Sequence, residues 1–241
     1  MRQQDEPAAW VRYTDDSTRA IPVSRLLLSD FEGSVPWRKL RSRHGQQHLS
    51  GSHWAATTRG HVLYESRLEL ARLLLADFDP DVKVIHPQPC RLIAPVGGRT
   101  RKHVPDFLLA LASGVVRVVN VKPADRLAHP KVADALAWPG ALFERHGWQY
   151  EIWSGCDPVI LDNVRFLAGY RRPGIVPDVE VQRAWAAVRS GEQLAVAERR
   201  LAAGQPPHTA RPALLALLWS GRLVTDLTRP LSGASILRRS A

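Results

Sequence analysis

Two neighbouring apolar segments carry residue types that could do chemistry together. Asp106 opens the first segment, and the run Asn120-Val121-Lys122 ends the second. Residues two apart on a strand face the same way, so Asn120 and Lys122 share a face. Carboxylate and amide oxygens suit Mg²⁺ or Mn²⁺. A nearby lysine can position or deprotonate water, or neutralise charge on phosphoryl oxygens. The combination predicts metal-assisted cleavage of a phosphodiester.

Whether these side chains meet depends on the turn between the two segments. If residues 112–114 form a three-residue hairpin loop ending in a left-handed glycine, Asp106 lies opposite Asn120 and diagonal to Lys122. A two-residue turn would place Asp106 opposite Val121 and separate the set. The alternative interpretation of the aspartate and the lysine is a cross-strand ion pair with a structural role.

A helix predicted upstream could supply a second carboxylate. In the segment YESRLELARLLLADF, apolar residues recur at helical spacing, and Glu65 and Glu69 fall four apart on one face. Glu69 would complete a metal site with Asp106 if the apolar stripe packs this helix against the sheet.

The order of predicted elements is helix, several strands, helix, strand and further helices, which indicates a mixed α/β sheet flanked by helices. Residues 1–34 are interpreted as an N-terminal lead-in. Residues 173–177, rich in proline and glycine, mark a hinge. Beyond it, 178–241 read as three helices and a hairpin, a small winged-helix-like domain. Its hairpin arginines could contact DNA as a wing.

Net charge points to a polyanionic partner. The chain has 33 Lys and Arg against 23 Asp and Glu, and 28 of the cations are arginines. Such a field favours nucleic acid, although a general compositional preference for arginine would give the same balance. No apolar run reaches the roughly 20 residues that cross a bilayer, so we expect a cytoplasmic protein without a membrane. Two distant cysteines imply neither a disulfide framework nor a zinc ribbon.

The stretch from Gly33 to Tyr64 contains no acidic residue. Its cations include Arg38, Lys39, Arg41 and Arg43, with tryptophans among them. The stretch is either a solvated loop or a surface that follows a DNA backbone.

Taken together, the segments SRLELARLLLADF, HPQPCRL, VPDFLL and VNVKPA resemble, in this order, the TnsA family. This family comprises the restriction-endonuclease-like subunits of heteromeric transposases, within the PD-(D/E)xK nucleases. The resemblance covers roughly residues 35–172 and implies a restriction-endonuclease-like nuclease domain there.

The resemblance also implies roles for individual residues. Glu69 matches the catalytic glutamate, Asp106 the metal-binding aspartate and Lys122 the catalytic lysine. Asn120 stands where most of these nucleases have a carboxylate and where the TnsA family can have glutamine. The implied ligands of Mg²⁺ or Mn²⁺ are Asp106, Glu69 and Val121, and the charge missing at Asn120 leaves the number of ions open.

Two more residues take expectations from the resemblance. Gln88 matches a glutamine close to the DNA backbone. Glu65 could compensate for the missing charge at Asn120, or it could be a surface acid paired with an arginine or histidine.

The function implied is cleavage of double-stranded DNA at transposon ends, on the strand that is left with a 5′ phosphate. The implied partners are a transposase with an RNase-H-like fold and an AAA+ ATPase regulator. Two alternatives stay open: a stand-alone restriction or defence endonuclease, and a DNA-binding protein without catalytic activity.

Overall fold

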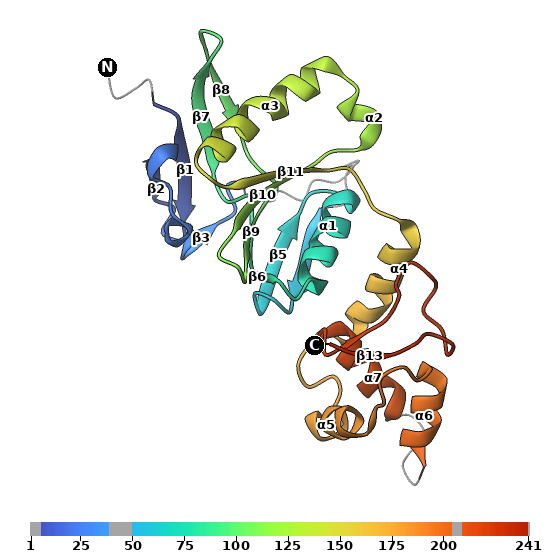
Figure 1. Ribbon diagram of the computed structural model, residues 1–241. Coiled ribbons are helices and arrows are strands. Elements are labelled where there is room, and N and C mark those ends of the chain that lie inside the picture. Colours follow the sequence, from blue (N-terminus) through green and yellow to red (C-terminus); the bar gives the residue numbers. More distant parts are fainter. Residues whose placement is uncertain (1–5, 39–49, 204–208, 241) are drawn as a thin grey trace. The chain divides into compact units, whose positions relative to one another are not determined.

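The protein is a mixed α/β chain that forms two compact units (Figure 1). The structure is a computed structural model, and it describes residues 6–38, 50–203 and 209–240. Unit 1 comprises residues 1–76 and 81–155, and unit 2 comprises residues 77–80 and 156–241. Within the described residues, no helix combines the length and the apolar character needed to span a bilayer.

The centre of unit 1 is a four-stranded sheet with the strand order β11-β10-β9-β6. Its strands and principal helices follow each other as α1 (Arg67–Phe78), β6 (Val82–Pro87), β9 (Phe107–Leu111), β10 (Val116–Val121), α3 (Pro130–Arg145) and β11 (Gln149–Trp153). Strand β9 is antiparallel to β6 and to β10, whereas β11 is parallel to β10. A parallel neighbour requires a crossover connection, and α3 supplies it. A short helix, α2 (Ala124–Leu127), precedes α3.

Helices α1 and α3 cover opposite faces of this sheet (Figure 1). Side chains alternate along each strand, so neighbouring residues of β10 enter different cores. Val119 and Val121 are buried with Leu73 of α1, and Val118 is buried with Phe143 of α3. The predicted α/β class is confirmed.

The hairpin between β9 and β10 has the three-residue loop considered from the sequence. Leu111 N–H donates to the Val115 carbonyl at 2.8 Å, and Val119 pairs with Phe107 at the far end. Gly114 has φ +82°, a conformation that glycine adopts without steric cost. This register carries Asp106 to the end of β10, as the longer turn predicted.

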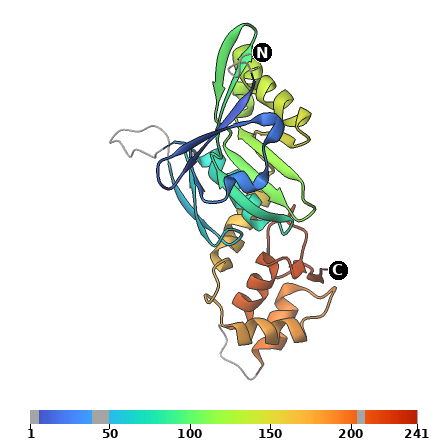
Figure 2. The ribbon, with the colours of Figure 1, turned by 90° about the vertical axis from the view of Figure 1, so that its left-hand side faces the viewer.

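A second sheet in unit 1 has the path β2-β1-β7-β8, with β3 paired to β1. Its strands are β1 (Ala8–Tyr13), β2 (Thr18–Pro22), β3 (Ser34–Val35), β7 (Arg91–Val96) and β8 (Arg99–His103). Along the sequence, β7 and β8 lie between β6 and β9. A separate hairpin consists of β4 (Gly51–Ala55) and β5 (Gly60–Tyr64). Figure 2 shows the N-terminal strands from a second direction.

The N-terminal residues differ from the lead-in that the sequence suggested. Strand β1 pairs with β7, and Ala9, Val11 and Phe31 are fully buried in the core beneath α3. Two short 3₁₀ helices, Val23–Arg25 and Leu28–Phe31, complete this packing. In β1 the partly exposed residues Ala8 and Trp10 are apolar like the buried Ala9 and Val11, so no apolar-polar alternation marks the strand in the sequence alone.

Unit 2 consists mainly of helices around a buried helix α7. Its elements are α4 (Pro158–Leu167), a 3₁₀ turn (Ala168–Tyr170), α5 (Asp178–Ala187), α6 (Leu194–Ala202), α7 (Ala210–Trp219), β12 (Leu223–Val224) and β13 (Arg238–Arg239). Helices α5, α6 and α7 are the three helices expected in 178–241, and Gly191, which has φ +91°, lies in the break between α5 and α6. The predicted C-terminal hairpin is a ladder of two residue pairs closed by a long loop.

Helix α4 belongs to unit 2, so the division of the chain falls near residue 155 and not at 173–177. Asn163 of α4 explains this placement. Its amide nitrogen donates to the carbonyls of Leu227 and Arg229 at 2.9 and 2.8 Å, and its oxygen accepts the Leu231 N–H at 2.9 Å. These bonds join α4 to the C-terminal loop by contacts that sequence spacing does not reveal.

Candidate active site

One cavity of unit 1, about 760 Å³ in volume, collects the residues that the sequence singled out. Glu69 from the first turn of α1, Asp106 from the start of β9, and Asn120 and Lys122 from the end of β10 all line it. Residues of β8 and of the first turns of α3 also line it, together with Arg38, Glu65 and Arg91. The cavity therefore lies where four elements of unit 1 end or begin.

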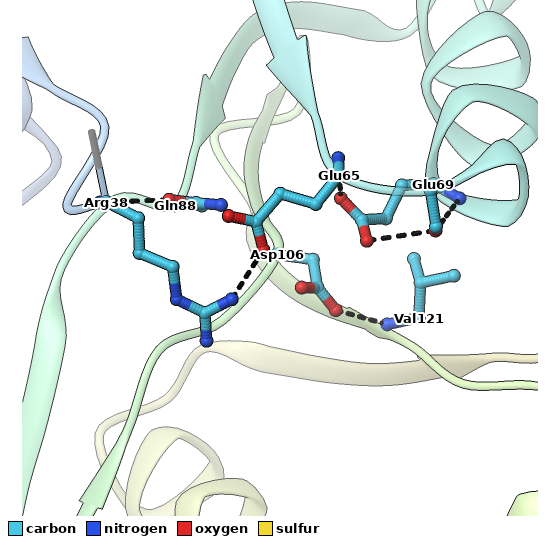
Figure 3. A network of polar contacts seen from close by, with 7 residues as sticks. Arg38, Glu65, Glu69, Gln88, Asp106 and Val121 are labelled. Carbon is cyan, nitrogen blue, oxygen red and sulfur yellow. Dashed lines mark hydrogen bonds and ion pairs between the residues drawn. The ribbon is translucent and has the colours of Figure 1, made fainter. Parts of the chain in front are cut away.

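Asp106 is fixed by three hydrogen bonds to two backbone segments, strand β10 and the residue that follows β6. Its N–H donates to the Val119 carbonyl at 3.0 Å, and its carbonyl accepts the Gln88 N–H at 2.8 Å. Its side-chain Oδ2 accepts the Val121 N–H at 2.7 Å (Figure 3). The second carboxylate oxygen, Oδ1, has no hydrogen bond to a described residue and is left for a ligand in the cavity.

Glu69 closes the N-terminus of α1 as well as lining the cavity. Its backbone N–H donates to Ser66 Oγ at 3.1 Å, and Ser66 Oγ–H donates back to Glu69 Oε1 at 3.0 Å. Its Oε2 accepts the Glu65 N–H at 2.7 Å (Figure 3). This is a variant of the capping box, in which Glu69 accepts from the Glu65 N–H and the Ser66 hydroxyl, and the Ser-x-x-Glu pattern signals this structural role although the sequence analysis missed it. Each carboxylate oxygen has a second lone-pair site, so capping does not prevent metal binding.

The electrostatics of the two carboxylates show that they are close together and poorly solvated. Burial raises the pKa of Asp106 to about 7, the Val121 hydrogen bond opposes this, and the negative charge of Glu69 adds to it. Burial also raises the pKa of Glu69, against its hydrogen bonds with Glu65 and Ser66. Lys122 and Arg38 lower the pKa of Asp106 from across the cavity. Strongly shifted carboxylates in a cleft are a frequent mark of functional sites.

Asn120 is held by a histidine that the sequence analysis did not select. The side chain of Asn120 is 1% exposed. His103 Nε2 lies 2.6 Å from Asn120 Oδ1, so the histidine nitrogen donates and the amide oxygen accepts. The edge of the Trp138 ring packs on the imidazole, with centroids 6.0 Å apart. Burial lowers the pKa of His103 to about 4, which keeps it neutral at pH 7.

Arg38, Glu65 and Gln88 form a second polar group beside the carboxylates (Figure 3). Arg38 pairs with Glu65 at 2.5 Å, which is the structural alternative considered for Glu65. Gln88 is 4% exposed and adopts φ +44°, the left-handed region that non-glycine residues seldom enter. Its Oε1 accepts the Arg38 N–H at 3.0 Å. The buried Gln88 is thus placed to hold the chain at Arg38 through its side-chain oxygen.

The remaining predicted residues fall into two groups. Val121 places its side chain in the core on the α1 side, so it could bind a metal only through its main-chain carbonyl oxygen. Lys39, Arg41 and Arg43 lie outside the described residues. Arg38 lines the cavity.

The donors present fit a hard cation with few protein ligands. Asp106 Oδ1 and the carboxylate of Glu69 are oxygen donors, and Mg²⁺ is usually bound by one or two carboxylates together with water and substrate phosphates. Mutual repulsion between two buried carboxylates is relieved by a cation between them. In the part of the chain that the structure describes, no group of three or more His, Cys, Asp or Glu side chains is arranged to hold a metal ion. A site here would therefore rely on substrate and water for its other ligands.

Comparison with known proteins adds no family assignment. No family model matches the chain, and no curated protein sequence matches it. The arguments for function therefore come from the chain itself.

Proposed function

We propose that this protein is a metal-dependent DNA endonuclease with a restriction-endonuclease-like fold, and that Glu69, Asp106 and Lys122 are its catalytic residues. The observation that carries the proposal is the convergence of these residues on one cavity from three separate elements, α1, β9 and the end of β10. A cross-strand ion pair alone would not account for the second buried carboxylate beside Asp106.

The proposed chemistry is hydrolysis of a phosphodiester. Asp106 Oδ1 and Glu69 would hold Mg²⁺ or Mn²⁺, which when bound polarises the phosphodiester and lowers the pKa of coordinated water. Lys122, exposed at the cavity, orients the attacking water or neutralises charge on the phosphoryl oxygens. The Val121 N–H fixes the orientation of the Asp106 carboxylate.

His103 has a supporting place in this proposal. Its Nε2–H is given to Asn120 Oδ1, which fixes the amide inside the protein and occupies one of the two lone-pair sites of its oxygen. The site then carries one negative charge fewer than a nuclease with a carboxylate at this position. We infer a single tightly held ion.

The finer assignment follows the TnsA resemblance. In that case the chain cleaves double-stranded DNA at transposon ends, together with an RNase-H-like transposase subunit and an AAA+ ATPase regulator. By the same resemblance, the C-terminal domain, residues 178–241, is the part proposed to dock these partners.

The test is cleavage of supercoiled plasmid by the full-length chain in Mg²⁺ or Mn²⁺, with and without a candidate transposase. We expect Asp106→Ala and Lys122→Ala each to lose at least about a hundredfold in rate, the order of magnitude of a positioned acid, base or charge-stabilising group. Glu32→Ala, which removes an exposed carboxylate outside the cavity, is the matched control.

The outcomes also separate the alternatives. Cleavage that requires the transposase supports the transposition role, whereas strong cleavage by the chain alone supports a stand-alone restriction or defence enzyme. A DNA-binding protein without catalytic activity would show DNA binding that Asp106→Ala leaves intact, with no metal-dependent scission under any of these conditions.

A further inference from the structure

The lysines of this chain gather at the cavity. The sequence contains five lysines among 33 cations, and three of them, Lys102, Lys122 and Lys131, line this one cavity. They come from β8, from the residue after β10 and from the first turn of α3. All three are exposed. Almost all cations elsewhere in the chain are arginines, so the lysines are concentrated at this cavity.

The three ammonium groups form no direct ion pair and no side-chain hydrogen bond with a described residue, although the charge of Lys122 acts on Asp106. Nearby arginines do form such pairs. Arg38 pairs with Glu65 at 2.5 Å, and Arg101, the neighbour of Lys102, pairs with Asp134 at 2.5 Å. A cation without an internal partner at a cavity rim is available to an anionic ligand.

The position of Lys131 opposes the stability of its own helix. It is the second residue of α3, and the first turn of that helix contains no acidic residue. The helix macrodipole disfavours a cation at this end. Lys131 therefore does not stabilise α3, and an anion bound nearby would offset the unfavourable charge at this end of the helix.

The cavity has opposite charges at its rim and in its depth. Lys102, Lys122 and Lys131 provide the positive rim, and Glu69 and Asp106 are the partly buried carboxylates beneath. A chain of phosphodiesters matches this polarity, because one phosphate can reach the carboxylates and their metal while its neighbours meet the rim. Lysine contacts phosphate as a flexible point charge and reads no base.

We propose that Lys102 and Lys131 bind the phosphates on either side of the one that is cleaved, so that the substrate is double-stranded DNA held by its backbone without regard to sequence. This inference rests on the proposed function. It assigns to β8 and α3 a binding role separate from the catalytic role of Lys122.

The experiment measures the affinity of the full-length chain for a labelled DNA duplex in a chelator, at a series of salt concentrations. The slope of log K against log salt counts the phosphates neutralised. We expect it to fall by about one for Lys102→Gln or Lys131→Gln and by about two for the double variant, equally for duplexes of unrelated sequence. Lys83→Gln on β6, outside the cavity, is the matched control and should leave the slope unchanged.

The charge-conserving double variant, Lys102→Arg with Lys131→Arg, should keep the wild-type slope. A double Gln variant with an unchanged slope, or with a change no larger than that of Lys83→Gln, overturns the proposal. So does weakening confined to one DNA sequence. A plasmid cleavage assay run in parallel separates the two proposals. If the double Gln variant keeps the wild-type slope while the wild-type chain cleaves DNA in a metal-dependent way, only the lysine assignment is wrong. If the slope falls in the double Gln variant but the wild-type chain cleaves no DNA with any metal or partner, only the endonuclease proposal is wrong.

Discussion

The lysines at the cavity of unit 1 and the paired arginines of unit 2 are used in opposite ways. At the cavity of unit 1, three lysines line a wall and form no ion pair with a residue that the structure describes. In unit 2, arginines are engaged inside the unit: Arg200 pairs with Glu192 at 2.6 Å and Arg211 pairs with Glu198 at 3.1 Å. Even Arg239 at the C-terminal ladder stacks on Trp185, with its guanidinium carbon 4.2 Å from the ring centroid.

This difference shows why net charge alone does not locate a binding site. A basic composition predicts a polyanionic partner somewhere on the surface, but an arginine already paired with a glutamate offers little to a ligand. The charge that matters is the charge left without a partner. The contrast between the cavity lysines of unit 1 and the paired arginines of unit 2 can be tested, and the largest expected effect comes first.

The largest effect concerns the pH dependence of stability without added metal. Because the folded chain raises the pKa of Asp106 from 3.8 to about 7, it binds a proton that the unfolded chain has released. The free energy of unfolding should therefore fall as pH rises from about 4 to about 7, by up to about 4 kcal/mol. Urea unfolding of wild type and Asp106→Asn across this range measures the contribution as a difference.

The comparison with Asp106→Asn is needed because His103 acts in the opposite sense. Its pKa is lowered to about 4, so stability from this group rises between about 4 and its unfolded value near 6.5. The His103 contribution is common to both proteins and cancels. If Asp106→Asn shows the same pH profile as wild type, the carboxylate is not in the desolvated position described.

The second prediction separates the two roles of Glu69. Glutamine can close a capping box as glutamate does, so Glu69→Gln should keep thermal stability nearly unchanged while cleavage falls by about a hundredfold. Ser66→Ala should do the reverse, lowering the free energy of unfolding by about 1 kcal/mol with cleavage largely kept. If Glu69→Gln loses thermal stability together with cleavage activity, the loss of activity follows from the lost helix cap and Glu69 has no separate catalytic role.

The third prediction concerns His103 as a positioning residue. Glutamine can place a donor nitrogen near the position of Nε2, whereas asparagine reaches only the position of Nδ1. His103→Gln should therefore retain most of the cleavage rate, and His103→Asn should lose about tenfold, with the free energy of unfolding reduced by about 1–3 kcal/mol for the unpaired Asn120 amide. Rescue by asparagine and not by glutamine would mean that His103 acts directly through Nδ1.

The smallest effect is expected in unit 2. Arg211→Gln breaks the ion pair with Glu198, which is partly exposed, so the free energy of unfolding should change by less than about 1 kcal/mol. The salt dependence of DNA binding should not change. If Arg211→Gln reduced the slope by about one, as expected for Lys102→Gln, a paired arginine of unit 2 would contact DNA as the cavity lysines are proposed to do, and the contrast would fail.

Local signals explain the parts of the fold that the sequence predicted. The glycine at 114 and the two apolar runs beside it define the hairpin register that carries Asp106 to the end of β10. The apolar stripe of α1 predicts which side of that helix meets the sheet. These features depend on neighbours in the chain, so they are readable without the structure.

Long-range packing explains what the sequence did not reveal. The bond between His103 and Asn120 joins residues on different sheets, and nothing in their spacing marks it. The left-handed backbone and the burial of Gln88 are set by the Arg38 and Asp106 segments on either side of it. The N-terminal strand β1 became visible only through its pairing with β7.

The central claim is that Asp106 and Glu69 together hold one divalent cation in the cavity. Calorimetric titration of Mn²⁺ into the full-length chain at pH 7.5 tests it without relying on DNA or on partners. We predict one bound ion for wild type and for Lys122→Gln, and loss of that binding in Asp106→Asn and in Glu69→Gln. Identical Mn²⁺ binding by wild type and Asp106→Asn, or no binding by any of the four proteins, would contradict the account.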